Sequence, residues 1–110
     1  MNEKDLQSLI RIALSDSCVC FRINVGLYYT KEGGRISTGV PNGFSDLFGH
    51  RKLDGKAFYI ECKTPTGKVR PEQKNFIKQM KQSGALAGIA RSVEEALEIV
   101  SESNIKQEEL

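Results

Sequence analysis

Hydrophobic residues recur at helical spacing in three segments of this chain. The first segment covers residues 3–14, where apolar positions lie three and four residues apart. A second helix is predicted over residues 71–82, because Pro71 suits the first position of a helix. The third helix begins after Ser92, which forms a capping box with Glu95. The side chains expected to face the core are Leu6, Leu9, Ile10, Ala13, Leu14, Phe76, Ile77, Met80, Val93, Ala96, Leu97 and Val100.

Apolar runs with strand character separate these helices. The predicted strands cover residues 18–24, 44–49, 57–63 and 86–90. Residues 26–38 contain two short strand-like runs around a pair of glycines, which predicts a hairpin or an extended flap. The helix at 71–82 lies between two strands and therefore implies a crossover. We predict an α/β (α+β mixed) fold, a central mixed β-sheet flanked by helices in the order αβββαβα.

Composition fits one ordinary globular domain. The chain has 110 residues, of which 39% are hydrophobic and 27% charged. We expect one domain over residues 1–110, with about 101–110 as a polar tail. No apolar run has the length of a membrane span, and the amino terminus does not resemble a signal peptide, so we expect a cytoplasmic protein without a membrane partner. The odd cysteine count without a CxxC pair favours buried thiols over a disulfide or zinc framework.

Net charge is only +2, but the basic residues are unevenly distributed. The middle of the chain carries Arg51, Lys52, Lys56, Lys63, Lys68, Arg70, Lys74, Lys78 and Lys81 with few acids between them. Such a segment could form a surface that faces phosphates. It could equally be the solvated side of a helix, and the charge pattern alone does not decide between the two.

The strand at 57–63 ends in charged residues. Because side chains alternate along a strand, Tyr59, Glu61 and Lys63 should share one face, and the residues between them should face the core. A carboxylate and an ammonium at the end of an apolar strand are costly to bury without a partner. The pattern indicates either a catalytic pair or an ion pair at a sheet edge.

Asp46 favours the catalytic interpretation. It lies in another predicted strand and is joined to the strand of Glu61 by one tight turn, so a hairpin would bring the two carboxylates together. Neighbouring carboxylates favour a cation between them, and Mg²⁺ prefers such oxygens. Asp46, Glu61 and the backbone carbonyl of Cys62 could supply three ligands. With a metal activating water and Lys63 stabilising the transition state, the pattern suits phosphodiester hydrolysis.

Two polar residues interrupt apolar helical stripes. Gln73 shares a stripe with Phe76 and Ile77, and Glu3 shares one with Leu6. Each side chain either points into the site from the end of its helix or reaches water there.

Together these residues resemble the PD-(D/E)XK nuclease superfamily and, within it, the virus-type replication-repair nuclease (VRR-NUC) domain. The resemblance covers nearly the whole chain and rests on Glu3, Gln7, Asn24, Gly26, the run GFSDL at 43–47, Glu61, Cys62, Lys63 and Gln73. It implies a restriction-endonuclease-like core in which Asp46 and Glu61 bind the metal and Lys63 is the catalytic lysine. Glu3 would be a further acidic residue near the metal, and Gln73 would support the site. Ser45 departs from the family, which often has proline before the aspartate.

The resemblance also implies a function. Domains of this kind that stand alone are similar to phage and bacterial endonucleases that use Mg²⁺ or Mn²⁺ and cut branched DNA as homodimers, like Holliday-junction resolvases. We therefore expect a metal-dependent endodeoxyribonuclease with DNA as its partner. Two alternatives remain at this point: a non-catalytic DNA-binding module that retains the nuclease fold, and a protein-interaction domain in which Glu61 and Lys63 merely pair.

Overall fold

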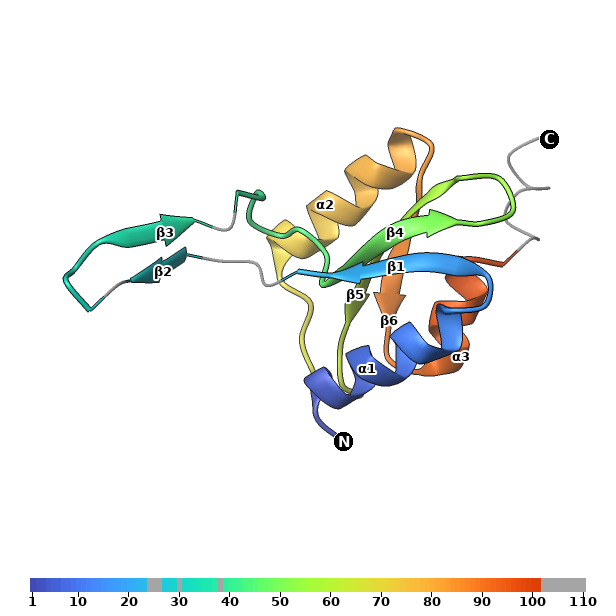
Figure 1. Ribbon diagram of the computed structural model, residues 1–110, viewed down its shortest axis with the longest axis horizontal. Helices are drawn as coiled ribbons and strands as arrows, with labels where there is room; N and C mark the ends of the chain where they lie inside the picture. The colour runs from blue at the N-terminus through green and yellow to red at the C-terminus, as the bar shows by residue number, and fades with distance from the viewer. Residues whose placement is uncertain (24–26, 30, 38, 102–110) are drawn as a thin grey trace.

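The computed structural model describes residues 1–23, 27–29, 31–37 and 39–101 (Figure 1). The helices are α1 (Glu3–Leu14), α2 (Pro71–Gln82) and α3 (Val93–Ile99). The strands are β1 (Cys18–Arg22), β2 (Leu27–Tyr29), β3 (Arg35–Ser37), β4 (Leu47–Arg51), β5 (Ala57–Cys62) and β6 (Leu86–Ala90).

A four-stranded mixed sheet forms the centre of the molecule. Its strand order is β1-β4-β5-β6; the first three strands are antiparallel and β6 runs parallel to β5. Helix α2 provides the crossover that a parallel pair requires. The predicted mixed sheet with flanking helices is thus confirmed, and β2 and β3 form a separate hairpin between β1 and β4.

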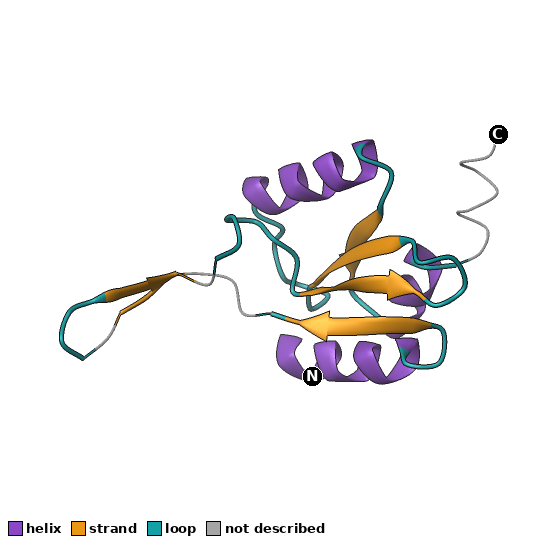
Figure 2. Cartoon of the chain, turned by 45° about the horizontal axis from the view of Figure 1, so that its top comes forward, coloured by secondary structure: helices purple, strands orange, loops and turns teal. Residues whose placement is uncertain are grey.

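Helices cover both faces of the sheet (Figure 2). Helices α1 and α3 enclose the main core, which contains Leu6, Ile10, Leu14, Leu47, Phe58, Ile60, Cys62 and Ala96. On the other face α2 packs over an aromatic cluster, in which the ring of Phe44 lies 4.9 Å from that of Phe76 and 5.9 Å from that of Tyr59. Strand β5 therefore has an apolar face towards α1 and an aromatic face towards α2.

Two predicted core residues are exposed. Leu9 and Leu97 each retain 41% of their accessible surface. Helix α1 buries a straight stripe of residues four apart, Leu6, Ile10 and Leu14, and this leaves Leu9 on the border of its apolar face. Helix α3 is short and buries Ala96, and this leaves the neighbouring Leu97 exposed.

The strand predicted over residues 44–49 begins later than expected. Strand β4 starts at Leu47, so Phe44 and Asp46 belong to the loop before it. The ring of Phe44 packs in the aromatic cluster beneath α2. This packing explains why an apolar residue occupies this position although it is not part of a strand.

The β2–β3 hairpin confirms the predicted flap and projects from the main body (Figure 1). The predicted family residues Asn24 and Gly26 lie outside the described residues, as does the polar tail after Ser101. No helix in the described part of the chain is both long and apolar enough to cross a membrane.

Candidate metal centre

Strand register brings Asp46 and Glu61 together at one end of the sheet. Leu47 of β4 pairs with Ile60 of β5 in an antiparallel ladder, so the residue before the first faces the residue after the second. The backbone N–H of Asp46 donates to Glu61 Oε2 at 3.3 Å. In return the backbone N–H of Cys62 donates to Asp46 Oδ2 at 3.2 Å. Each of the two carboxylates is thus oriented by a backbone N–H group of the neighbouring segment.

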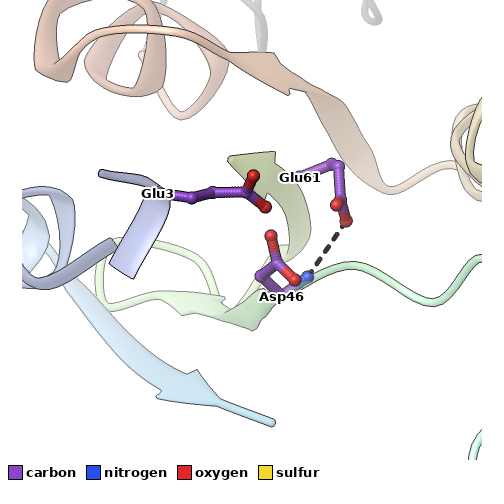
Figure 3. Close-up of side chains that lie close together, drawn as sticks. All are labelled: Glu3, Asp46 and Glu61. Carbon is purple, nitrogen blue, oxygen red and sulfur yellow. Dashed lines mark hydrogen bonds between the residues drawn. The ribbon is translucent and has the colours of Figure 1, made fainter. Parts of the chain in front are cut away.

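Helix α1 adds a third carboxylate. Glu3 lies in its first turn, after the N-cap Asn2, and its side chain extends towards Asp46 (Figure 3). One oxygen from each of Glu3, Asp46 and Glu61 lies within 4.8 Å of the other two. Hard oxygen donors in this number suit Mg²⁺ or Mn²⁺, which complete their octahedral shells with water and substrate. The donor set therefore fits the metal that the sequence predicted.

Lys63 lies beside these carboxylates. It follows β5 on the same side as Glu61, and its backbone N–H extends the ladder to β6 by donating to the carbonyl of Ala90 at 3.0 Å. Its Nζ is 3.8 Å from Glu61 Oε1, and the residue is only 8% exposed. Three carboxyl groups thus lie near one ammonium, and a divalent cation would balance the charge of their ionised forms.

Gln73 in the first turn of α2 points into the site and is only 4% exposed. Its Nε2 donates to Glu61 Oε1 at 2.9 Å, and its Oε1 accepts from the backbone N–H of Arg70 at 3.0 Å. The second bond fixes which end of the amide is the donor. Gln73 therefore holds Glu61 Oε1 in place and leaves Oε2 towards Asp46.

The environment of Glu61 disfavours its charged form. Burial foremost, and then the negative charge of Asp46, raise the pKa of the Glu61 carboxyl to about 8, while the ammonium of Lys63 opposes the rise. A cation between the two carboxylates would remove both the unscreened repulsion and much of the burial penalty. The side chains alone therefore do not stabilise the ionised form of Glu61.

Gly43 allows the loop before Asp46 to approach α2. Its φ is +86°, and a Cβ there would lie 2.3 Å from the carbonyl oxygen of Glu72, in the first turn of α2. Only glycine accommodates both conditions without displacement of the backbone. This contact joins the loop that carries Asp46 to the turn that carries Gln73.

Replacing Gly43 by alanine is therefore expected to lower the free energy of unfolding by about 2–5 kcal/mol, as left-handed strain and overpacking add. Gly55→Ala is the matched control, because Gly55 also has a positive φ, +72°, but no atom lies within 4 Å of its added Cβ. The control should lose only about 1–2 kcal/mol. Urea denaturation of both variants measures the difference, and equal losses would show that the contact with α2 is unimportant.

Sequence reasoning missed Arg91. This residue directly follows β6, and its Nη1 donates to the carbonyl oxygens of Thr64 at 2.6 Å and Gly67 at 2.8 Å. It thereby holds the loop that follows Lys63. The only sequence signal is a cation after a strand end, which is too common to single out.

Ser45 is fully buried, and among the described residues its hydroxyl has no hydrogen-bond partner. An apolar residue would fit this position better. The serine nevertheless leaves Asp46 in contact with Glu61 and Cys62. The departure from the family pattern therefore does not disrupt the carboxylate cluster.

The family model of the VRR-NUC domain matches residues 2–94, a span that includes every residue of this cluster. The chain belongs to the VRR-NUC family. No curated protein matches the chain. Membership of the VRR-NUC family implies a nuclease-type function in DNA processing, with DNA as the partner. The four-stranded sheet with helices on both faces agrees with a nuclease core.

Proposed function

We propose that this VRR-NUC domain is an endonuclease that hydrolyses DNA phosphodiester bonds with Mg²⁺ or Mn²⁺. The observation that carries the proposal is the convergence of three carboxylates within 4.8 Å, with the buried ammonium of Lys63 3.8 Å from one of them. An ordinary ion pair at a sheet edge needs one carboxylate, and it would be exposed. The number of acids and the burial of Glu61 and Lys63 favour a metal site.

Asp46 and Glu61 would hold the metal, together with the backbone carbonyl of Cys62, and Glu3 would contribute a further carboxylate. The bound ion would supply an activated water and positive charge at the scissile phosphate. Hydrogen bonds from the backbone N–H groups of Cys62 and Asp46 orient the carboxylates of Asp46 and Glu61, so little reorganisation would be needed when the ion binds.

Lys63 would act on the substrate. Its ammonium would orient the attacking water and stabilise the charge that develops on the pentavalent phosphorus. Gln73 would act through Glu61, whose Oε1 it holds at 2.9 Å. It is thus a positioning residue.

Branched DNA and a homodimer complete the proposal. Cutting two strands of a junction symmetrically requires two sites related by a two-fold axis, which a dimer supplies. These two points rest on the family resemblance and on this symmetry requirement.

The test is cleavage of labelled DNA. A four-way junction, a flap, a duplex and a single strand are incubated with Mg²⁺, with Mn²⁺ and with EDTA, using the wild type and Lys63→Met. We expect metal-dependent cuts, fastest on the junction, and none with Lys63→Met. Equal cutting by wild type and variant would remove the mechanism.

The second candidate is a DNA-binding module without catalysis, which is motivated by Ser45, where the family often has proline before the aspartate. Calorimetric titration with Mn²⁺ distinguishes the two functions. A nuclease should bind Mn²⁺ through Asp46 and Glu61, whereas a pure binder should show DNA affinity without a metal site.

Replacing Gln73 by alanine is expected to lower the cleavage rate by about 10–100-fold, because Glu61 loses the group that orients it. Gln79→Ala is the matched control, since Gln79 is exposed on the same helix. Cleavage rates are measured at saturating and at limiting Mn²⁺. Excess Mn²⁺ should restore the rate if the variant only binds the metal more weakly, but not if the variant has lost its fold. A Gln73 variant with wild-type rates would exclude a positioning role.

A further inference from the structure

The basic segment of the sequence does not form one surface. Arg51 is buried and forms an ion pair with Asp54 at 2.9 Å, at the end of the sheet away from the metal centre. Lys63 belongs to the metal centre itself. The three lysines of α2 behave differently, because all are exposed and lie together.

These lysines line an open groove of about 360 Å³ between α2 and β6. We call it the α2 groove; its lining residues are Lys74, Ile77, Lys78, Lys81, Gln82 and Ile89. The lining residues of α2 extend from Lys74, directly after Gln73, to Gln82 at the end of the helix, which corresponds to about 12 Å of helix. The groove therefore begins next to the residue that holds Glu61 and leads away from it.

The sheet places the floor of the groove beside the metal centre. Ile89 of β6 pairs with Glu61 of β5 in the parallel ladder, and directly paired residues project from the same face of a sheet. Glu61 meets α2 on that face through Gln73. Ile89, which lines the groove, therefore lies one strand away from Glu61 on the same face of the sheet.

Within the part of the chain that the structure describes, the charge of the groove has no counterpart. Among the described residues, none forms an ion pair or hydrogen bond with the side chains of Lys74, Lys78 or Lys81. The acidic residue of α2, Glu72, lies 3.4 Å from Arg70 instead. Like charges three and four residues apart destabilise a helix slightly. Stability of the domain does not explain this stripe, whereas an anionic ligand would.

We propose that the α2 groove binds the phosphate backbone of the DNA strand that enters the metal centre. Lys74 and Lys81 are about 10 Å apart along the helix axis. If α2 lies along the axis of B-DNA, where the rise is about 3.4 Å per nucleotide, this distance spans about three nucleotides of one strand. The groove would set the direction of the DNA strand next to the scissile phosphate. Its apolar floor would contact the sugars of that strand. The inference rests on the proposed function, since it deepens the same site.

The test compares DNA binding by two triple variants. In Lys74→Gln/Lys78→Gln/Lys81→Gln the groove loses its charge. In Arg11→Gln/Lys52→Gln/Lys56→Gln the same charge is lost away from the groove, on α1 and in the turn between β4 and β5. Fluorescence anisotropy with a labelled DNA duplex and a labelled junction is measured in EDTA, to prevent cleavage, between 50 and 300 mM salt, roughly the range over which phosphate contacts weaken. Thermal unfolding and Mn²⁺ titration of each variant verify the fold and the metal centre.

We expect the groove variant to bind duplex DNA on the order of 10²-fold more weakly at 0.1 M salt, and its salt slope to fall by about 0.9 for each lost phosphate contact. The control variant should lose much less, and Mn²⁺ affinity should not change in either. Equal losses in the two variants would overturn the proposal, as would a wild type without measurable DNA binding at low salt. If the wild type binds DNA through the lysines but never cuts with Mn²⁺, the groove stands and the nuclease proposal fails.

Discussion

Replacing Asp46 by asparagine is expected to lower DNA cleavage by about 10³-fold or more, while the domain stays folded. In the wild type the backbone N–H of Cys62 donates to Asp46 Oδ2 at 3.2 Å. Asparagine keeps the shape of the side chain, and its carbonyl oxygen can still accept this hydrogen bond. It removes the charge that a divalent ion needs. The variant therefore separates the electrostatic role of Asp46 from its part in joining β4 and β5.

Initial rates on a four-way junction and calorimetric titration with Mn²⁺ measure the two losses together. Asp16→Asn serves as the control, because Asp16 is exposed in the turn between α1 and β1. It should cut and bind Mn²⁺ like the wild type. An Asp46→Asn enzyme that binds Mn²⁺ with unchanged affinity would show that the metal lies elsewhere.

In a metal-free buffer, the free energy of unfolding is expected to fall as the pH rises from about 5 to about 8. The folded protein raises the pKa of the Glu61 carboxyl from 4.5 to about 8, so the folded state binds the proton more tightly than the unfolded state. The resulting stabilisation is complete below the unfolded pKa and is lost as the pH passes through the folded pKa. The slope can reach about 1.4 kcal/mol per pH unit within this window.

Metal should reverse this behaviour. A bound cation favours the ionised carboxylate, so saturating Mn²⁺ should stabilise the domain more at pH 8 than at pH 5. Glu61→Gln should be more stable than the metal-free wild type at pH 8, because its buried side chain carries no charge, and it should gain little from Mn²⁺. Urea denaturation at several pH values, with EDTA and with Mn²⁺, measures both effects.

The exposed Glu94 provides the control for this experiment. Glu94→Gln should retain the pH dependence and the stabilisation by Mn²⁺ of the wild type. Stability that rises between pH 5 and pH 8 in EDTA would contradict the burial and repulsion described for Glu61.

The two experiments address different properties of one arrangement. The Asp46→Asn variant tests whether the carboxylates bind an ion. The Glu61→Gln variant tests how much their proximity lowers the free energy of unfolding when no ion is present. Both depend on a register in which Leu47 faces Ile60. A shift of one residue would turn Glu61 to the opposite face of the sheet, into the apolar core of α1 and α3.

Local patterns predicted the elements well where one residue type decides the backbone. Pro71 placed the start of α2, and the capping residues Asn2 and Ser92 begin α1 and α3 as their side chains suggest. Alternation along β5 separated the buried Phe58 and Ile60 from the face of Glu61. These features depend on neighbours a few residues away, which the sequence shows directly.

Other features depend on contacts between distant segments. Phe44 looks like part of a strand because it is apolar, yet it lies in a loop whose partner is Phe76 of α2. Arg91 holds a loop some 24 residues earlier in the chain, at Gly67. The close approach of Gly43 to Glu72 is likewise invisible until both segments are folded.

The sequence by itself determined the helices, the four strands of the sheet, and the candidate residues Asp46, Glu61 and Lys63, because periodicity and the unusual placement of charges are local properties of a chain. Only the tertiary structure decided that Glu3 and Gln73, carried by helices on opposite faces of the sheet, both approach the carboxylate of Glu61. It also decided that three lysines of α2 line a groove beside Glu61. Burial, strand register and the spacing of charges in three dimensions arise from packing, which a linear pattern of residue types does not contain.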